Sequence, residues 1–339
     1  MTHRNKPAPQ RVRMEDVARI AGVSPATVSR ALRAPASVSD VLRERVQSAA
    51  QRLGYAPNRI AGSLAGARAP LIGVIVPSLT NSFFAATLER MTALLEPEGY
   101  QLMIGQHDYD VDREEAIVTA FSSWNPAALV ITGREHTRGT LGILSKATSP
   151  VVEMWDYGER PIDIGIGFSN ATAGHIAAQH FVDTGCRSAA FIGAILGKDG
   201  RARARADGFQ DRFQQLTGIS PNLLSADSRD LGEGGNALRQ VLAEQPETQA
   251  IAFSGDMLAL GAMFEASRMG LAIPDDLKIL GYGDLDIGPF TNPPLSTIRP
   301  PRREIADKVV EQILHRFAEP DADGINIDLG VQLIRRETA

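Results

Sequence analysis

Three polar side chains near the N-terminus could bind a polyanion. Thr27, Ser29 and Arg30 stand close together in the stretch DVARIAGVSPATVSRAL, residues 16–32. Hydroxyl groups and the N-terminus of a helix bind phosphates, and a guanidinium can donate two hydrogen bonds to the edge of a guanine. These residue types therefore point to contacts with nucleic acid, provided that one helix presents them on one side.

The surrounding apolar residues predict two short helices joined by a tight turn. Gly22 can end the first helix in a left-handed conformation, Ser24 can cap the second, and Pro25 suits its first turn. The inward positions are Val17, Ala18, Ala21, Val23, Val28 and Leu32. The positions left outside are Ala26, Thr27, Ser29 and Arg30. This is the pattern of a helix-turn-helix whose second helix enters the major groove, with a plain helical hairpin as the alternative.

A second group of polar and aromatic side chains follows the ends of predicted strands. Ligands of open α/β sheets bind beyond the carboxyl ends of the strands. The candidates are Phe83, Phe84, Thr132, Arg134, Trp155, Asp156 and Phe168. Phe83 and Phe84 begin a helix, so they suit either the wall of a cleft or the core. Asp256 opens a later helix and is either a helix cap or a ligand contact.

No residue pattern indicates catalysis. The first strand is followed by PSLTNS and not by Gly-x-Gly-x-x-Gly, and GAILGKDG lacks the spacing of a phosphate loop. The chain has neither His-Glu-x-x-His nor Gly-x-Ser-x-Gly, and its six histidines are scattered. Cys186 is the only cysteine, which excludes an internal disulfide and a thiolate metal cluster. We expect a protein that is not an enzyme and needs no metal or cofactor.

Charge is distributed unevenly along the chain. The first 70 residues contain twelve Lys or Arg and four Asp or Glu, a net charge of about +8, and the remainder contains 23 and 36, about −13. A basic segment on an acidic body favours nucleic-acid binding, although a solvated basic tail has the same composition. The start of the chain lacks the apolar core of a secretory signal, and no run of 18 apolar residues occurs, so we expect a cytoplasmic protein without a membrane segment.

Hydrophobic periodicity predicts the elements that position these residues. Three helices are expected near 14–21, 25–33 and 39–52. Strands are then expected near 71–77, 100–106, 127–132, 150–155, 162–168, 188–194, 250–254, 277–283 and 327–335. The intervening helices are expected near 82–97, 112–123, 171–184, 201–217, 233–244, 256–269 and 301–318. Strands alternating with helices over this length predict two doubly wound α/β lobes.

Several stretches carry a resemblance to a known family. They are DVARIAGVSPATVSRAL, VSDVLRERVQSAAQRLGYAPNRIAGSLA, LIGVIVPSLTNSFF and GYGDLDIGPFTNPPLSTIRPP. Together they resemble the LacI/GalR repressors nearly end to end. The resemblance implies a homodimeric reader of double-stranded operator DNA with a periplasmic-binding-protein-like core. The implied domains are a basic disordered leader (1–12), a helix-turn-helix domain (13–57), a hinge helix (58–69), an N-terminal core lobe (70–168 and 300–323) and a C-terminal core lobe (169–299 and 324–339).

The same resemblance implies roles for individual DNA-contacting residues. Base contacts fall on Pro25, Ala26 and Arg30, and phosphate contacts on Ser24, Thr27 and Ser29. The hinge NRIAGSLA contributes Asn58 and Arg59, and Leu64 corresponds to a wedge inserted into the minor groove. The family often has an arginine where this chain has Gly62, so the hinge here is expected to order less readily without DNA. A passive linker is the alternative. The helices near 82–97 and 301–318 are expected to supply dimer contacts.

Arg205, in GRARARADGF, corresponds to the family's effector-clamping arginine, while Arg201 and Arg203 are expected at the surface or cavity mouth because three arginines at spacing two cannot share one face. Gly255 and Gly283 replace the usual Asn and Asp, which argues against a neutral-sugar pocket. Asp284, next to Gly283, is expected to contact the effector. TGREHTRGTLGIL, VVEMWD, PIDIGIGFSN and GYGDLDIG resemble gluconate-operon repressors. We therefore expect a repressor of a carbohydrate or sugar-acid operon whose small effector, such as gluconate, binds between the lobes. The alternatives are a neutral-sugar or purine effector, or a sugar-binding protein or enzyme without a DNA function.

Overall fold

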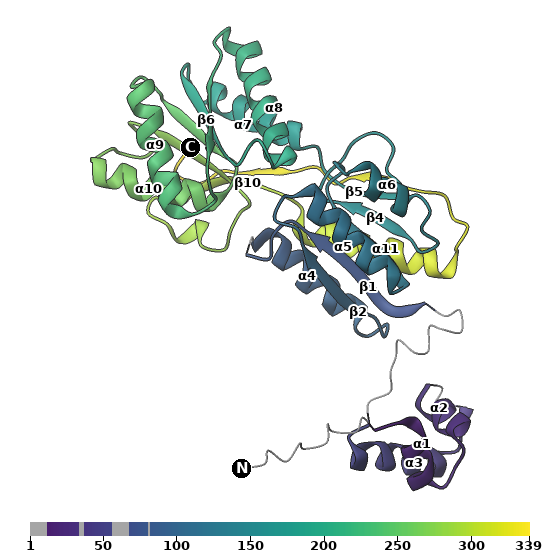
Figure 1. Cartoon of the computed structure of the whole chain (residues 1–339). Coiled ribbons are helices and arrows are strands. Elements are labelled where there is room, and N and C mark those ends of the chain that lie inside the picture. The colour runs from purple at the N-terminus through teal and green to yellow at the C-terminus, as the bar shows by residue number, and fades with distance from the viewer. Residues whose placement is uncertain (1–11, 34–36, 56–67, 81) are drawn as a thin grey trace, which may run out of the picture. The chain divides into compact units, whose positions relative to one another are not determined.

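The structure is a computed structural model that describes residues 12–33, 37–55, 68–80 and 82–339. The chain divides into two compact units, Met1–Ala69 and Pro70–Ala339. Each unit is described by itself (Figure 1). Asn58, Arg59 and Leu64, expected in the hinge, lie outside the described residues.

The N-terminal unit is a bundle of three helices. They are α1 (Met14–Ala21), α2 (Pro25–Arg33) and α3 (Asp40–Leu53). Gly22 has φ 62° and donates its backbone N–H to the last carbonyls of α1, which a residue without a Cβ does at no steric cost. The buried residues of all three helices form one apolar cluster, with Val17, Val28 and Val46 fully buried. The predicted helix-turn-helix is confirmed.

The first lobe of the second unit is built on a six-stranded sheet in the order β11-β5-β4-β3-β1-β2. The strands are β1 (Ala69–Val76), β2 (Gln101–Gln106), β3 (Pro126–Thr132), β4 (Val151–Met154), β5 (Ile164–Gly167) and β11 (Asn326–Asp328). The helices are α4 (Ser82–Leu95), α5 (Val111–Ser123), α6 (Arg138–Leu144) and α11 (Arg302–Ala318). Strand β3 is buried along its whole length, as expected for a central strand covered by helices on both faces.

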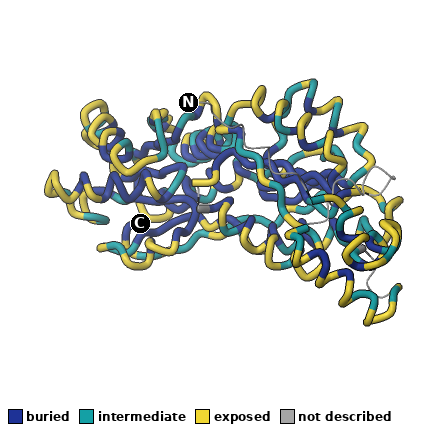
Figure 2. The backbone as a smooth tube through the Cα atoms, turned by 60° about the horizontal axis from the view of Figure 1, so that its bottom comes forward, coloured by how far each residue is buried: buried dark blue, intermediate teal, exposed yellow. Residues whose placement is uncertain are grey.

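The second lobe repeats this plan with the strand order β12-β10-β9-β8-β6-β7. The strands are β6 (Ala189–Ala194), β7 (Asn222–Ala226), β8 (Ala250–Phe253), β9 (Lys278–Tyr282), β10 (Ser296–Arg299) and β12 (Gln332–Ile334). The helices are α7 (Asn170–Asp183), α8 (Gly200–Thr217), α9 (Leu231–Glu244), α10 (Asp256–Met269) and the short η3 (Gly288–Phe290). In Figure 2 the buried strands run through the middle of each lobe and the exposed residues lie on the outer helices.

The chain passes between the two lobes three times, after β5, after β10 and after β11. The last passage corrects one predicted boundary. Residues 324–339 were expected to belong wholly to the second lobe, but β11 pairs in parallel with β5 of the first lobe, and only β12 joins the second sheet. The expected strand at 327–335 is therefore two short strands, because the chain leaves one sheet and enters the other within those residues.

Four of these elements were not predicted from the sequence. They are α6, β7, β10 and η3. Each is short, and β7 is only partly buried because it lies at the edge of its sheet, so its residues show no continuous apolar run. In the part of the chain that the structure describes, no helix has the length and apolar character needed to span a bilayer.

Candidate functional site

The turn between α1 and α2 presents the start of α2 to solvent. The Ser24 hydroxyl accepts a hydrogen bond from the backbone N–H of Thr27 at 3.1 Å, and the two hydroxyls lie 2.9 Å apart. Ser24 thus caps the helix as predicted, which fixes how its first turn is oriented. Pro25 and Ala26 are exposed beside it.

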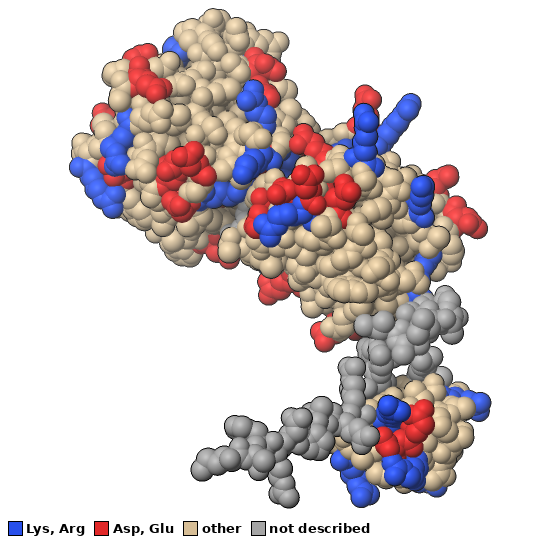
Figure 3. All heavy atoms as spheres, viewed as in Figure 1, with Lys and Arg blue, Asp and Glu red and all other residues tan. Residues whose placement is uncertain are grey.

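The outward face of α2 carries the remaining residues expected to contact DNA. Thr27 and Ser29 are half-buried and Arg30 is exposed, while Val28 between them is fully buried. Among the described residues, Arg30 has no hydrogen-bond or ion-pair partner, so its guanidinium is available to a ligand. Figure 3 shows Lys and Arg side chains at several places around this unit, where they can meet phosphates.

The second unit contains a cavity of about 290 Å³ between its two lobes. The first lobe contributes Ser78, Thr80, Phe83, Phe84, Tyr109, Trp155 and Phe168. The second contributes Asn170, Asp199, Arg201, Arg205, Arg229, Asp230, Ser254, Gly255, Asp256, Met257, Leu258, Tyr282 and Leu285. Most of these residues lie at the carboxyl ends of strands or in the loops that follow, where the topology predicts a ligand.

Aromatic rings form one wall of the cavity. Trp155 stacks against Phe83 with ring centroids 6.3 Å apart and meets Phe84 edge-on at 5.1 Å. Phe168 lies 6.1 Å from Trp155 on another side. Phe83 and Phe84 therefore agree with both alternatives that the sequence left open, because they are buried in the core and also line the cavity.

Trp155 has two properties typical of a binding residue. Its backbone has φ 70°, a conformation rare for a side chain of this size, and such strain is concentrated at functional sites. Its indole N–H is buried and has no hydrogen-bond partner among the described residues. A buried donor of this kind is stabilised when a ligand oxygen accepts from it.

Arg205 lies where the family resemblance places the effector clamp. Its Nη1 donates to Oδ1 of Asn170 at 2.5 Å, and its Nη2 donates to the Ser254 carbonyl at 3.4 Å. The guanidinium stacks 4.0 Å from the ring centroid of Tyr282. Burial raises the pKa of the Tyr282 hydroxyl to about 12, so the ring stays neutral and can carry this cation–π contact.

The position of Arg201 differs from the one predicted from the sequence. It was expected at the surface or mouth, but its side chain is only 14% exposed and lines the cavity. It lies over the rings of Phe84 and Tyr109, at 5.7 and 5.9 Å from their centroids. Positions 201 and 205 are one helical turn apart and therefore share a face of the helix. The prediction considered only the spacing of two residues between neighbouring arginines and overlooked this spacing of four. Arg203 does lie outside, where it pairs with Asp207 at 2.8 Å.

Several cavity residues were missed because they lie in loops, and Tyr109, Arg229 and Asp199 are among them. Tyr109, with φ 60°, follows β2, and Arg229 follows β7 and stacks 3.7 Å from the Tyr109 centroid. Asp199 caps α8 through the backbone N–H of Ala202 and lies 3.0 Å from Arg229 Nη2. Burial works against its charge, but the neighbouring arginines hold the pKa of Asp199 below its ordinary value. The positive φ of Tyr109 cannot be predicted from hydrophobic periodicity.

Three expected ligand contacts lie in an adjoining hollow of about 50 Å³ and do not line the main cavity. Thr132 donates its hydroxyl to the Ile75 carbonyl at 3.1 Å, and Arg134 donates to the Glu159 carbonyl. Asp156 accepts from Asn170 Nδ2 at 3.0 Å, and burial raises the pKa of its carboxyl. Asp156 thus positions Asn170, the partner of Arg205.

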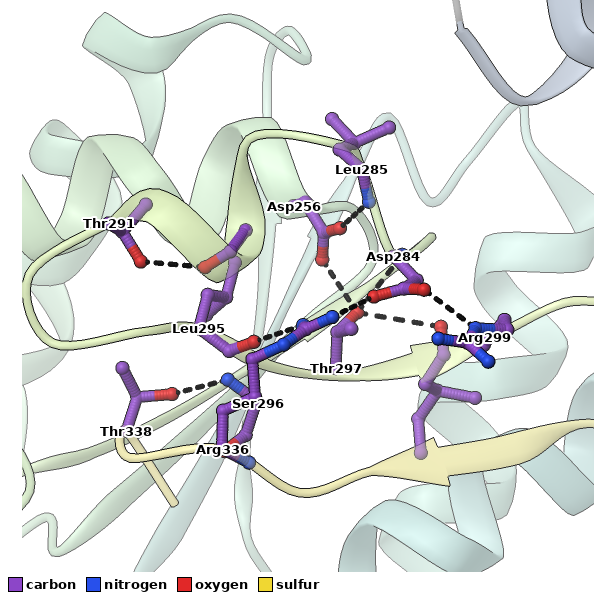
Figure 4. Close-up of polar contacts among 12 residues, drawn as sticks. Asp256, Asp284, Leu285, Thr291, Leu295, Ser296, Thr297, Arg299, Arg336 and Thr338 are labelled. Carbon is purple, nitrogen blue, oxygen red and sulfur yellow. Dashed lines mark hydrogen bonds and ion pairs between the residues drawn. The ribbon is translucent and has the colours of Figure 1, made fainter.

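The two remaining aspartates have different surroundings (Figure 4). Asp256 lines the cavity and accepts from the Leu285 N–H and the Thr297 hydroxyl, both at 2.7 Å. It is the first residue of α10 and not its N-cap, which is Gly255. Burial raises the pKa of Asp256 to about 6.

Asp284 does not line the cavity, which corrects its assignment to the ligand. Its carboxylate lies between Arg299 Nε at 2.6 Å and Arg336 Nη2 at 2.5 Å (Figure 4). Although burial favours the neutral acid, these two arginines lower the pKa of Asp284. Its backbone, with φ 52°, turns the side chain toward β10 and the C-terminal segment. Asp284 is therefore an ion-pair partner that fastens β9 to those segments.

The first lobe contains a buried group of ionisable residues. His136 Nδ1 lies 2.7 Å from Glu114 Oε1, and its Nε2 lies 3.7 Å from Glu153 Oε1. Burial opposes a charge on the ring, but the two carboxylates prevail and raise the pKa of His136 to about 9. The described residues hold no His, Cys, Asp and Glu group arranged to bind a metal ion.

The chain was compared with known proteins. Residues 13–58 match the bacterial regulatory proteins of the lacI family, and residues 178–339 match the periplasmic binding protein-like domain. The HTH-type transcriptional regulator GntR of Pseudomonas aeruginosa is 37% identical over 332 residues, which cover 96% of this chain and 95% of that protein.

Solved structures give the same result. A LacI-family transcriptional regulator from Silicibacter pomeroyi has a TM-score of 0.90 at 33% identity, covering 96% of this chain and 99% of the other. The lac repressor dimer bound to operator and the anti-inducer ONPF has a TM-score of 0.81 at 26% identity, covering 97% and 99%. The chain therefore belongs to the lacI family of bacterial regulatory proteins and is a DNA-binding transcriptional regulator.

Proposed function

We propose that this regulator represses an operon for the use of a sugar acid, and that the sugar acid, such as gluconate, binds in the cavity between the lobes. The observation that carries the proposal is the charge of the cavity. Arg201, Arg205 and Arg229 line it together with Asp199, Asp230 and Asp256. Among the described residues, only Asp199 of these carboxylates forms an ion pair with any of the three arginines. Guanidinium groups whose ion pairing within the protein is incomplete favour a ligand with a carboxylate.

The polar groups around the arginines suit the hydroxyl groups of the same ligand. Asn170, the Trp155 indole N–H and Asp256 provide donors and acceptors around an apolar wall. The volume of about 290 Å³ accommodates a six-carbon sugar acid. The aromatic wall would also suit a purine base, which makes a purine the second candidate effector.

Operator binding is assigned to the exposed start of α2. Arg30 reads a base through its exposed guanidinium, Pro25 and Ala26 make apolar contacts, and Ser24, Thr27 and Ser29 lie near phosphates. The lac repressor relative is bound to its operator as a dimer. For Asn58, Arg59 and Leu64 the proposal rests on the family resemblance alone, and a Leu64→Ala variant that bends operator DNA as strongly as the wild type would refute the hinge role.

A homodimer is supported by an exposed apolar face on the second lobe. Met257 and Phe264 lie two helical turns apart on α10 and are 41% and 54% exposed. Ile287 and Phe290 follow β9 and are also exposed, and the Leu285 N–H bonded to Asp256 holds this loop against the start of α10. We propose that a second copy of the chain covers this face. The two helices expected at the interface, α4 and α11, pack on each other through Arg90 and Asp307.

The two sites are coupled by linkage. An effector that binds one arrangement of the lobes more tightly raises the population of that arrangement. A coupling free energy of about 1–3 kcal/mol then changes operator affinity by about 5- to 150-fold. In this proposal the chain has no catalytic activity, and it acts on DNA in the bacterial cytoplasm, at the nucleoid.

A gel-shift experiment tests the proposal. The DNA is the region upstream of the neighbouring genes, used at two salt concentrations with gluconate, a neutral sugar and a purine added singly. We expect binding to weaken steeply with salt and only gluconate to change it. A change caused only by the purine would favour the second candidate, and binding that no salt concentration weakens would contradict the α2 assignment.

A further inference from the structure

We infer that Arg201, and not Arg205, binds the carboxylate of the effector and makes the cavity selective for acids over neutral sugars. The inference rests on the proposed function and concerns the same cavity. It follows from the hydrogen bonds that each guanidinium already makes within the protein.

Arg205 is held by its neighbours. Nη1 is bonded to the Asn170 amide oxygen at 2.5 Å, Nη2 faces the Ser254 carbonyl, and the flat face rests on Tyr282. Asn170 is itself held by Asp156 at 3.0 Å. Within the described residues only Nε of Arg205 lacks a partner. The end-on pair of donors includes the Nη1 bonded to Asn170, and the side-on pair, Nε and Nη2, includes the Nη2 that faces the Ser254 carbonyl. A carboxylate that took two parallel hydrogen bonds from Arg205 would compete with one of these contacts, so Arg205 suits single contacts with hydroxyl groups.

Arg201 is buried to a similar extent but bonded weakly. Its one hydrogen bond to the described residues, from Nη1 to the Thr132 carbonyl, is 3.4 Å long. Its nearest carboxylate oxygen, Asp199 Oδ1, lies 3.7 Å from Nη2, beyond hydrogen-bond distance. Its other neighbours are the faces of Phe84 and Tyr109, which accept no strong hydrogen bond. A guanidinium has five N–H donors, and most of those of Arg201 have no good acceptor in the described structure.

The arrangement of Asp199 explains why Arg201 stays available. One carboxylate oxygen of Asp199 lies 3.0 Å from Arg229, and the other accepts from the Ala202 N–H at the start of α8. Arg229 is fixed in turn by stacking on Tyr109 at 3.7 Å. The hydrogen bonds of Asp199 therefore go to Arg229 and the helix terminus. Its ion pair with Arg201, at 3.7 Å, is too long for a hydrogen bond and leaves the N–H donors of Arg201 for a ligand.

Arg201 also lies at the junction of the two lobes. It belongs to α8 of the second lobe, and its Nη1 reaches the Thr132 carbonyl at the end of β3 in the first lobe. Gly133 leaves room for it, because a Cβ there would lie 2.8 Å from Nη1. A carboxylate that binds Arg201 competes with this long contact between the lobes. Binding of the carboxylate therefore changes a contact that connects the two lobes.

Two ligands that differ only in the carboxylate test the inference. Gluconate and D-glucitol share the hydroxylated chain, and glucitol carries CH₂OH in place of the carboxylate. The full-length chain is titrated with each, followed by tryptophan fluorescence because Trp155 lines the cavity. The variants are Arg201→Gln, Arg201→Lys and Arg205→Gln. Arg203→Gln is the matched control, since Arg203 lies on the same helix but outside the cavity.

We expect the wild type and the Arg203→Gln control to prefer gluconate. Arg201→Gln should lower gluconate affinity about 10- to 100-fold and leave glucitol affinity nearly unchanged, because a charge-assisted hydrogen bond is lost. Arg201→Lys should keep part of the preference because the charge remains. Arg205→Gln should lower the affinity for gluconate and the affinity for glucitol by a similar factor.

Each contrary result has a distinct meaning. A preference for gluconate that survives in Arg201→Gln, or that disappears selectively in Arg205→Gln, overturns the assignment to Arg201 and leaves the sugar-acid proposal standing. A wild type that binds neither ligand, or binds both equally, overturns the sugar-acid proposal and the Arg201 assignment with it.

Discussion

Gly174 on α7 faces the backbone carbonyl of Arg205 on α8 so closely that a Cβ at position 174 would lie less than 3.0 Å from the carbonyl oxygen. Gly208 makes the reciprocal approach to Ala171 one turn further along. The two helices therefore touch backbone to backbone at the turn of α8 that carries Arg205. The position of Arg205 therefore depends on a glycine in another helix.

Gly174→Ala should consequently destabilise the second unit and disturb the cavity. The added methyl group must push α8 away, which costs about 1–3 kcal/mol of unfolding free energy. Urea unfolding measures this loss. Gly142→Ala is the control, because a Cβ at that position of α6 meets nothing within 4 Å, and it should leave stability unchanged or raise it by about 0.5–1 kcal/mol. Equal stability of Gly174→Ala and the wild type would contradict the close helix packing.

Arg205→Ala should yield a protein that binds operator but no longer responds to effector. The change removes the contacts with Asn170 and Tyr282 inside the cavity and leaves the N-terminal unit intact. Operator affinity measured by gel shift should equal that of the wild type and stay the same when gluconate is added. Arg203→Ala, on the outside of the same helix, should respond like the wild type, and a full response in Arg205→Ala would count against its place in the effector site.

Stability should fall between pH 6.5 and about 9 because of His136. The carboxylates of Glu114 and Glu153 raise the pKa of His136 to about 9 against a burial cost that opposes its charge. The folded state therefore holds this proton more tightly than the unfolded state does. The stability gained is fully present below the ordinary value of 6.5 and is lost as the pH rises through 9. The loss is about 3 kcal/mol at 1.36 kcal/mol for each pH unit.

Chemical denaturation at pH 6.5, 8 and 9.5 measures that loss. A His136→Gln variant should be less stable at pH 6.5 and should lack the part of the decline that His136 causes. A wild type and a variant that decline in parallel would show that His136 is not the group responsible.

Arg30→Ala should weaken specific operator binding by about 1–3 kcal/mol and relax the preference at one base pair. Arg30 is exposed on α2 and has no partner among the described residues, so its removal should leave the fold unchanged. Arg43→Ala is the matched control, because Arg43 lies on α3 and pairs with Asp40 at 2.8 Å. Base-substituted operators separate the two effects: if Arg30→Ala lowers affinity for all sequences equally, Arg30 contacts phosphate and does not read a base.

The sequence predicted those elements whose pattern is long and local. The helix-turn-helix followed from Gly22, Ser24 and the buried valines, since a cap and an apolar stripe lie within a few residues of one another. The long helices and central strands followed from their periodicity. The division of the last 16 residues between two sheets did not, because β11 and β12 have three residues each and pair with strands distant in the sequence.

The sequence predicted the aromatic wall of the cavity and its residues Arg205 and Asp256, but not its other charged residues. Phe83, Phe84 and Trp155 follow strands, so the topology alone brings them together. Tyr109 and Arg229 meet only because loops of different lobes approach each other. Asp284 was misassigned because its direction depends on a positive φ and on Arg336, 52 residues away in the chain. Attention to helical spacing alone would have placed Arg201 beside Arg205.

The most direct test of the whole account measures coupling in both directions. Operator affinity of the full-length dimer is determined with and without saturating gluconate, and gluconate affinity with and without operator, at one fixed salt concentration. The account predicts that both ratios differ from one by at least about 5-fold and that the two ratios are equal, as linkage requires. Operator and gluconate that bind without changing each other's affinity would contradict it.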